Sequence, residues 1–168
     1  MSYISDIEQA IADRLAPFGT VGYTVQVLPE NQSEYETKPF LNGQITVAFH
    51  SSKYGKTNAI GQGVSQYETT KFIIAVRSKK LRGDKGIYNI VSIIRRYLVG
   101  FRPVENSWAM TADEMALKEA TREDALWTYY ITFDVMRLAV EETPSDDSAL
   151  LALLTFDDLV TGGTNTVP

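Results

Sequence analysis

The side chain with the most versatile chemistry in this sequence is the single histidine, His50. Histidine can act as a general acid or base or bind a metal, but it needs partners to do so. The sequence has no cysteine and no second histidine, and it contains neither HExxH nor GxSxG. Because a Ser-His-Asp triad is recognised by geometry, sequence does not exclude one. We interpret His50 as a structural residue near a strand end, with a small enzyme built on it as the alternative.

Two glycine-bearing stretches are candidates for phosphate binding, GQG at 61–63 and GDKG at 83–86. Neither matches the P-loop or the GxGxxG pattern. The second precedes a predicted helix, whose N-terminal amides attract anions, and Lys85 adds a positive charge there. The plainer interpretation is a turn followed by a helix cap, and the anion site stays an alternative.

Adjacent carboxylates recur along the chain, but their spacing does not suit a shared metal. Neighbouring residues of a strand point to opposite faces, and such pairs in polar segments are usually solvated. The sequence therefore predicts no metal, no cofactor and no enzyme. The pairs are Asp113–Glu114, Glu123–Asp124, Glu141–Glu142, Asp146–Asp147 and Asp157–Asp158.

Positive charge is concentrated in one region of an acidic chain. The 168 residues hold 16 Lys+Arg against 21 Asp+Glu, and eight of those 16 lie between Arg77 and Arg102. The last 28 residues carry six acids and no base. This asymmetry indicates that one region meets an acidic surface and another a basic one. The overall acidity argues against a dedicated nucleic-acid binder. The densest basic stretch, 77–86, holds Arg77, Lys79, Lys80, Arg82 and Lys85.

The sequence shows no targeting or membrane segment. Its opening, MSYISDIEQAI, has early acids and no long apolar run, unlike a signal peptide. No window approaches the roughly 20 apolar residues that a membrane helix needs. We expect a soluble protein that stays where it is made unless it joins an assembly.

The first half of the chain predicts one helix and three strands. Ile4, Ile7, Ile11 and Leu15 fall on one face of a helix over 5–17, with Ser5 and Glu8 as a capping box. Alternating apolar residues predict strands at 23–27, 41–50 and 66–77. The polar, glycine-bearing segment 51–63 between the last two predicts a mobile loop.

The second half predicts another helix and two or three strands. A stripe of apolar residues spans 86–100, with Asp84 as N-cap and Gly100 as C-cap. Short strands are possible around 107–110 and 114–119. The strand 125–140 exceeds the usual five or six residues or so, which predicts that it projects beyond its own sheet. Its aromatic residues, Trp127, Tyr129, Tyr130 and Phe133, suit a core and an interface better than base stacking.

This order of elements predicts an α+β fold, a mainly antiparallel sheet with two helices packed on one face. We expect one domain over 1–142 and an extended C-terminal arm over 143–168. The arm contains ALLALLTFDDLV, which is apolar and acidic and fits a strand or a helix equally well.

Four segments carry a resemblance to a known family. They are IEQAIADRLAPFG, NGQITVAFHSSKYG, FIIAVRSKKLRGDKGIYNIVSIIRRYLVGFRP and WTYYITFDVMRLAVE. In pattern and order over 1–142, the chain resembles the tail terminator proteins of contractile-tailed, Mu-like phages. It also resembles the cap proteins of related contractile injection systems. The family fold is an α+β domain of one sheet and one helix layer.

The resemblance implies a structural role without catalysis. Copies of the chain would form a hexameric ring on the last tail tube and sheath rings, stop polymerisation and offer a surface to the neck or head connector. The protein would belong to the virion tail, assembled in the host cytoplasm, with DNA only in transit through the channel. Alternatives are a neighbouring neck or head-completion protein, and a nucleic-acid-binding module acting through Lys79, Lys80 and Arg82.

Under this resemblance three segments become candidate protein interfaces. The basic stretch would contact an acidic surface on a partner ring. The loop with Tyr54 and Lys56 would contact an adjacent ring. The arm would dock on a neighbouring copy by strand addition or in a groove. The plainer interpretations are a solvated turn, a loop tip and an arm folded on its own sheet. The arm residues concerned are Leu150, Leu151, Leu153, Leu154 and Phe156.

Overall fold

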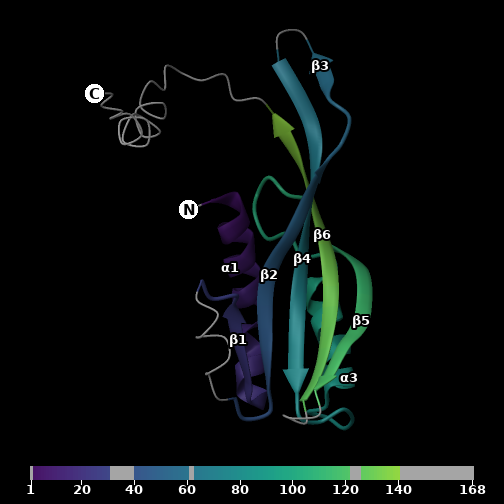
Figure 1. Cartoon of the computed structure of the whole chain (residues 1–168). Helices are drawn as coiled ribbons and strands as arrows, with labels where there is room; N and C mark the ends of the chain where they lie inside the picture. The colour runs from purple at the N-terminus through teal and green to yellow at the C-terminus, as the bar shows by residue number, and fades with distance from the viewer. Residues whose placement is uncertain (1, 31–39, 61–62, 122–125, 141–168) are drawn as a thin grey trace, which may run out of the picture.

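A single twisted sheet forms the centre of the molecule in this computed structural model (Figure 1). The structure describes residues 2–30, 40–60, 63–121 and 126–140. Within these ranges six strands form one sheet, ordered β1-β2-β4-β6-β5, with β3 paired to β4 at one end. None of the helices in these ranges has the length and apolarity to span a membrane.

Helix α1, Tyr3–Leu15, begins two residues earlier than its sequence pattern predicts. Ser2, and not Ser5, is the N-cap, because its side chain accepts from the backbone N–H of Ser5 at 3.3 Å. Glu8 is not part of a capping box. Its carboxylate accepts from the backbone N–H of Phe49 at 2.7 Å, which ties the helix to β2. A short 3₁₀ helix, η1 (Ala16–Val21), follows.

Helix α3, Ile87–Leu98, carries the predicted apolar stripe but has a different N-cap. The cap residue is Gly86, and Asp84 instead accepts a hydrogen bond at its carbonyl from the side chain of Asn89. A Cβ at Gly86 would lie 2.4 Å from the carbonyl group of Arg82, so the turn before the helix requires glycine. Gly100 has a φ of 84°, which suits its place two residues beyond the helix end.

Strand β1, Tyr23–Val27, pairs in parallel with β2, Gly43–Tyr54, whereas every other strand pair is antiparallel. The predicted mobile loop over 51–63 is wrong for most of its length. Residues 51–54 continue β2, β3 spans Asn58–Ile60, and β4 begins at Gly63 and ends at Ser78. The segment forms strand because Ser51–Tyr54 pair with Glu68–Lys71 across the sheet.

The longest ladder joins β4 to β6, Leu126–Val140, over 14 residue pairs from Ser65↔Val140 to Ser78↔Trp127. The prediction that this strand projects beyond its own sheet is wrong, because β4 is equally long and pairs with it throughout. The short strand suggested near 114–119 is part of a longer edge strand, β5, Thr111–Thr121, whereas the one suggested near 107–110 is not a strand. Only an isolated bridge, Ser107↔Arg137, precedes β5.

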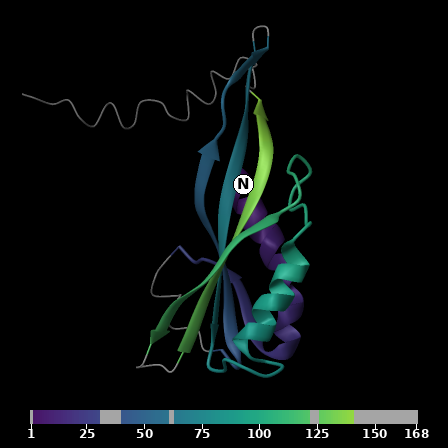
Figure 2. The same cartoon turned by 90° about the vertical axis from the view of Figure 1, so that its right-hand side faces the viewer.

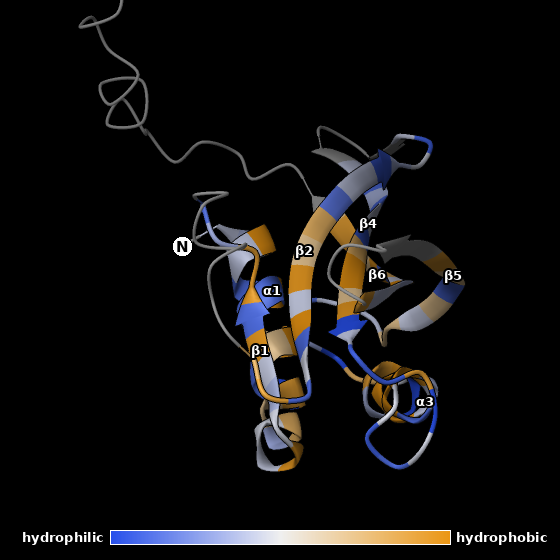
Figure 3. Ribbon diagram, turned by 60° about the horizontal axis from the view of Figure 1, so that its bottom comes forward, coloured by the Kyte–Doolittle hydropathy of each residue, from blue (hydrophilic) through white to orange (hydrophobic). Residues whose placement is uncertain are grey.

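Both helices lie on one face of the sheet, as the sequence predicts (Figures 2 and 3). Alternate residues of the strands face them, so that Phe72, Ile74 and Val76 are fully buried while Lys71, Ile73 and Ala75 are not. The α+β class with a mainly antiparallel sheet is confirmed. The upper halves of β2, β4 and β6 reach beyond the helix layer (Figure 2). We call these three strand ends, residues 51–54, 63–71 and 135–140, together with Trp108, whose backbone N–H donates to Met136, the blade.

Neighbouring isoleucines on α3 allow a matched test of this packing. Ile94 is fully buried, whereas Ile93 is only partly buried against the same core. We expect Ile94→Ala to lower the free energy of unfolding by about 2–5 kcal/mol, because it removes contacts and leaves a cavity. Ile93→Ala should cost less than about 1 kcal/mol. Urea unfolding measures both, and equal losses would contradict the described orientation of α3.

Candidate interaction surfaces

The turn that carries the basic residues is held in place by a buried tyrosine. The hydroxyl of Tyr23, in β1, donates to the backbone carbonyl of Lys85 at 2.9 Å and lies 3.1 Å from the hydroxyl of Ser78. Burial raises the pKa of the Tyr23 phenol, although the hydrogen bond with Ser78 acts in the opposite direction. Ser78 Oγ also accepts from the backbone N–H of Lys80 at 3.2 Å. The uncharged hydroxyl groups of Tyr23 and Ser78 therefore hold the backbone of the turn in place.

The basic side chains themselves face solvent. Lys79, Lys80, Arg82 and Lys85 are exposed on the turn, which occupies the end of the molecule opposite the blade tip (Figure 1). The ammonium group of Lys79 lies 6.0 Å from the ring centroid of Phe40. Arg77 is separate, since it belongs to β4 and is half-buried on the sheet face without helices. The turn thus presents four neighbouring positive charges on a rigid support.

The anion site considered for the start of α3 is not open. The backbone N–H of Ile87 donates to the carbonyl of Lys80 at 2.9 Å, and that of Tyr88 to the carbonyl of Leu81 at 3.3 Å. The next two amides, of Asn89 and Ile90, donate to Gly86. Because these amides already have acceptors, the helix start offers little to a phosphate.

The blade carries large apolar side chains in contact with water. Tyr54, Tyr67, Trp108 and Leu138 are all exposed, and Tyr67 and Trp108 stack at 5.4 Å between ring centroids. Tyr54 ends β2, and Lys56 lies exposed in the link to β3, so the predicted pair does sit near the blade tip. Among the described residues β5 pairs with β6 no further than Asp134, so the blade has a side edge that this strand does not cover.

A buried charge pair fastens the blade to α1. Arg137 Nε donates to Glu68 Oε2 at 2.6 Å, and the guanidinium lies 3.6 Å from the ring centroid of Tyr3. The Glu68 side chain is only 4% exposed. Burial alone raises the pKa of this carboxyl, but hydrogen bonds from Arg137, Ser52 and Tyr54 more than offset it, so the pKa lies below its usual value. The carboxylate therefore stays charged in the fold.

The sheet face without helices has a polar centre. Lys71 Nζ bonds to the carboxylate of Asp113 and lies 3.7 Å from that of Asp134. Hydrogen bonding to Lys71 holds the pKa of Asp113 below its usual value and raises that of Lys71. Thr132 Oγ1 lies 3.3 Å from the same carboxylate. This network joins β4, β5 and β6 and is structural in character.

His50 lies inside β2 and not near a strand end as the sequence suggested. It is exposed and occupies the β-bulge of β2, where the register with β4 shifts between Phe49 and Ser51. No group of three or more acidic or histidine side chains in the described part of the chain could hold a metal ion. Of the carboxylate pairs, only Asp113–Glu114 is described, and the other four lie outside the described residues.

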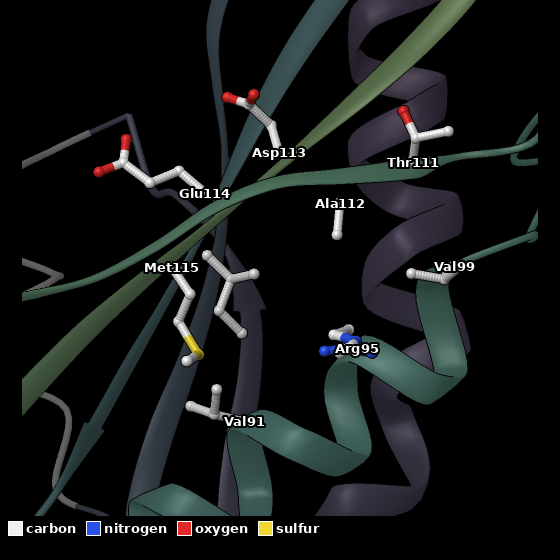
Figure 4. Close-up of a pocket in the computed structure, with 9 residues that line it drawn as sticks. Val91, Arg95, Val99, Thr111, Ala112, Asp113, Glu114 and Met115 are labelled. Carbon is white, nitrogen blue, oxygen red and sulfur yellow. The ribbon is translucent and has the colours of Figure 1, made fainter.

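A groove lies between α3 and the edge strand β5, with a volume of about 480 Å³ (Figure 4). Val91, Arg95 and Val99 line it from the helix, at a spacing of four that places them on one face. Ala112 and Met115 of β5 point into it, whereas Asp113 and Glu114 at its rim point away (Figure 4). Met115 is 59% exposed and Val99 48%. The groove is thus an apolar hollow open to water beside a cation.

Sequence reasoning missed this groove, because its lining residues belong to two elements that no local pattern brings together. The bulge between Ala112 and Met115 that shapes its wall also has no clear sequence signature. The one available signal was Met115, a large apolar residue directly after Asp113 and Glu114. The predicted interface residues of the arm, Leu150, Leu151, Leu153, Leu154 and Phe156, lie outside the described residues.

These features define an α+β sheet-and-helix domain with exposed aromatic, basic and grooved surfaces. The chain belongs to the Gp37 protein family, whose model matches residues 13–158. No curated protein matches its sequence. Among solved structures, a chain from "Virion of native gene transfer agent (GTA) particle" superposes with a TM-score of 0.49 at 12% identity. That match covers 82% of this chain and 96% of the other. A likeness of this degree does not establish a function.

The ion pair between Glu68 and Arg137 in the blade predicts a pH-dependent stability. Because the pKa of Glu68 is lowered from 4.5 in the fold, its charged form stabilises the protein above that pH. The contribution is lost as the pH falls through the lower, folded-state value. We expect Glu68→Gln to reduce the free energy of unfolding by about 1–3 kcal/mol at pH 7.

At an acidic pH below the folded-state pKa of Glu68, the difference in the free energy of unfolding between Glu68→Gln and the unaltered protein should be smaller than at pH 7, because the carboxyl of the unaltered protein is then neutral. Urea unfolding at the two pH values measures it. Glu105→Gln, at an exposed position, is the matched control and should change little at either pH. A gap of the same size at both pH values would show that the Glu68 charge is not what stabilises the fold.

Proposed function

We propose that this chain is a virion structural protein and, more specifically, a tail terminator that forms a hexameric ring. The ring caps the tail tube and sheath, stops tail polymerisation and joins the tail to the neck or head connector. The protein works in the virion tail after assembly in the host cytoplasm, and DNA only passes through its channel. Its function lies in its interfaces and requires no catalytic residue or cofactor.

The observation that carries this proposal is the blade. A sheet that extends beyond its helices, with Tyr54, Tyr67, Trp108 and Leu138 exposed on it, would be a liability in an isolated monomer. A neighbouring copy in a ring would cover such side chains and edges. The segment pattern that resembles tail terminators points to the same role.

The two ends of the long strands suit contacts along a tail axis. The blade tip and the basic turn lie at opposite ends of β4, whose 16 residues span about 50 Å. The blade end exposes Tyr54 and Tyr67 together with Lys53 and Lys56, whereas the other end carries Lys79, Lys80, Arg82 and Lys85. A ring stacked between two different assemblies needs two chemically different faces. The basic turn fits an acidic protein surface better than DNA, because strong phosphate contacts would hinder passage through a channel.

A second candidate is a neck or head-completion ring of the same particle, one layer away. The same surfaces would serve it, so the two roles differ only in which preformed structure the protein binds. Binding to headless tails supports the terminator, whereas binding only to heads or connectors supports the neck protein.

Removal of the arm tests the terminator role directly. We expect particles assembled with a chain truncated after residue 142 to have tails of irregular length, because the capping ring no longer forms stably. Length histograms from negative-stain images measure this. A truncation confined to 161–168, beyond the apolar arm residues, is the matched control and should leave lengths uniform. Uniform tails with both truncated chains would contradict a role for the arm in termination.

Neutralisation of the basic turn separates protein docking from DNA binding. We expect Lys79→Gln, Lys80→Gln and Arg82→Gln together to weaken attachment to the neighbouring ring about tenfold, through loss of charge contacts. Co-sedimentation with preformed tails measures attachment. Affinity for duplex DNA across a salt series should be weak and unchanged by the triple variant. Tight, salt-dependent DNA binding that the variant abolishes would favour the nucleic-acid-binding module instead.

A further inference from the structure

The groove between α3 and β5 lacks an occupant in the described part of the chain. Met115 and Val99 leave about half their surfaces in water, although both border a hollow that could bury them. Its volume of about 480 Å³ lies within the range of about 300–1,000 Å³ that is usual for ligand pockets. An apolar segment inserted there would remove these side chains from water.

The shape of the groove follows from the bulge in β5. Ala112 pairs with Phe133 and Met115 with Ile131, so Asp113 and Glu114 together oppose the single residue Thr132 and form the bulge. A bulge bends its strand, and here the carboxylates turn outward while Ala112 and Met115 face the helix (Figure 4). The floor is Ile131 and Val91, both almost completely buried. The interior of the groove is therefore apolar, and the acids are confined to its rim.

Positive charge marks the helix side of this groove. Arg95 lines it, whereas Arg96, on the same last turn of α3, is exposed on another side of the helix, in a hollow that it shares with Arg14. Within the described residues, neither guanidinium forms a salt bridge. An occupant that is apolar along most of its length and acidic at one end would complement both features.

We infer that this groove receives the C-terminal segment 150–158 of a neighbouring copy of the same chain. This rests on the proposed ring and names the contact that closes it. The segment reads LLALLTFDD, five large apolar residues followed directly by Asp157 and Asp158. The apolar residues enter between α3 and β5, and the carboxylates of Asp157 and Asp158 lie against Arg95.

Chain length favours a neighbouring copy over the chain's own groove. Val140 ends β6, and nine residues, 141–149, separate it from Leu150. They span at most about 30 Å when fully extended. The groove lies beside Ile131, nine residues back along β6, which is also about 30 Å. Folding back onto the chain's own groove would therefore use the whole reach of the linker.

One segment and one groove per chain also produce a closed assembly. Each copy gives its segment to the next and receives one from the previous copy, which is a head-to-tail contact. Such contacts generate a ring when the rotation between copies closes. The segment would form the contact between neighbouring subunits, at a different surface from the blade and the basic turn.

The chain contains no cysteine, so an introduced pair reports on this contact without interference. The experiment uses the full-length protein with Met115→Cys and Leu153→Cys, oxidised mildly and separated by non-reducing electrophoresis. We expect a ladder of disulfide-linked multimers that collapses to monomer on reduction. The control pairs Leu153→Cys with Leu41→Cys, an exposed residue beside β2 at the other side of the sheet, and should remain mostly monomeric.

Two results would overturn the inference. A disulfide within one chain, seen as a compact monomer band, would place the segment in its own groove. Multimers no more abundant than in the Leu41→Cys control would mean that the segment docks elsewhere. If rings still form in either case, the proposed terminator function stands and only the proposed contact between the segment and the groove is wrong. If the protein forms no ring and binds no tails, the proposed function itself is wrong.

A charge exchange tests the acidic end of the segment independently. Arg96→Glu should change self-association little, whereas Arg95→Glu should weaken it roughly tenfold, since the proposed contact with Asp157 and Asp158 becomes repulsive. Adding Asp157→Arg and Asp158→Arg to the Arg95→Glu chain should restore it. Both arginines are exposed, so the variants should fold normally. Failure of these two added changes to restore association would contradict the proposed pairing.

Discussion

The antiparallel ladder between β4 and β6 is the constraint on which the other features of this molecule depend. Its 14 pairs set one register for both faces of the sheet. That register places Phe72 opposite Phe133 beneath the helices and Glu68 opposite Arg137 in the blade. It also places Lys71 opposite Asp134 on the other face. A slip of one residue would turn every one of these side chains to the wrong face.

The same ladder explains why part of the sheet is left without helices. Helices α1 and α3 span 13 and 12 residues, or roughly 20 Å each, whereas β4 spans about 50 Å. Two helices of this length cannot cover the strands from end to end. The blade is held instead by the Glu68–Arg137 pair and by Tyr3, and part of its apolar surface stays open to water. A partner subunit is the natural cover for such a surface.

Local patterns in the sequence predicted the elements better than the contacts between them. The stripe of α3 and the alternation of β4 follow directly from side-chain period, and both are confirmed. The parallel pairing of β1 with β2 could not be predicted, because its direction depends on the path between the strands. The sequence pattern favoured Ser5 as the cap of α1 with Glu8 as its partner, but Ser2 caps the helix and Glu8 bonds to Phe49 of β2 instead.

Among the candidate surfaces too, those that depend on local sequence could be predicted, and those that depend on tertiary contacts could not. The basic turn is visible in the sequence as a run of like charges, but its support, Tyr23, lies 62 residues before Lys85. The groove depends on a bulge in β5 and on the angle at which α3 crosses the sheet. Neither the bulge nor this angle has a local sequence signature, so the groove could be found only from the tertiary structure. The arm was recognised from its composition alone, and its role remains a proposal.

The most direct test of the account is the mass of the purified full-length protein across concentration, alone and with preformed tails. If the protein is a ring subunit, a species of about six times the 18.7 kDa monomer mass should appear as the concentration rises, or the protein should accumulate on the tails. A monomer at every concentration that also ignores tails would contradict the claim that this fold is a ring subunit.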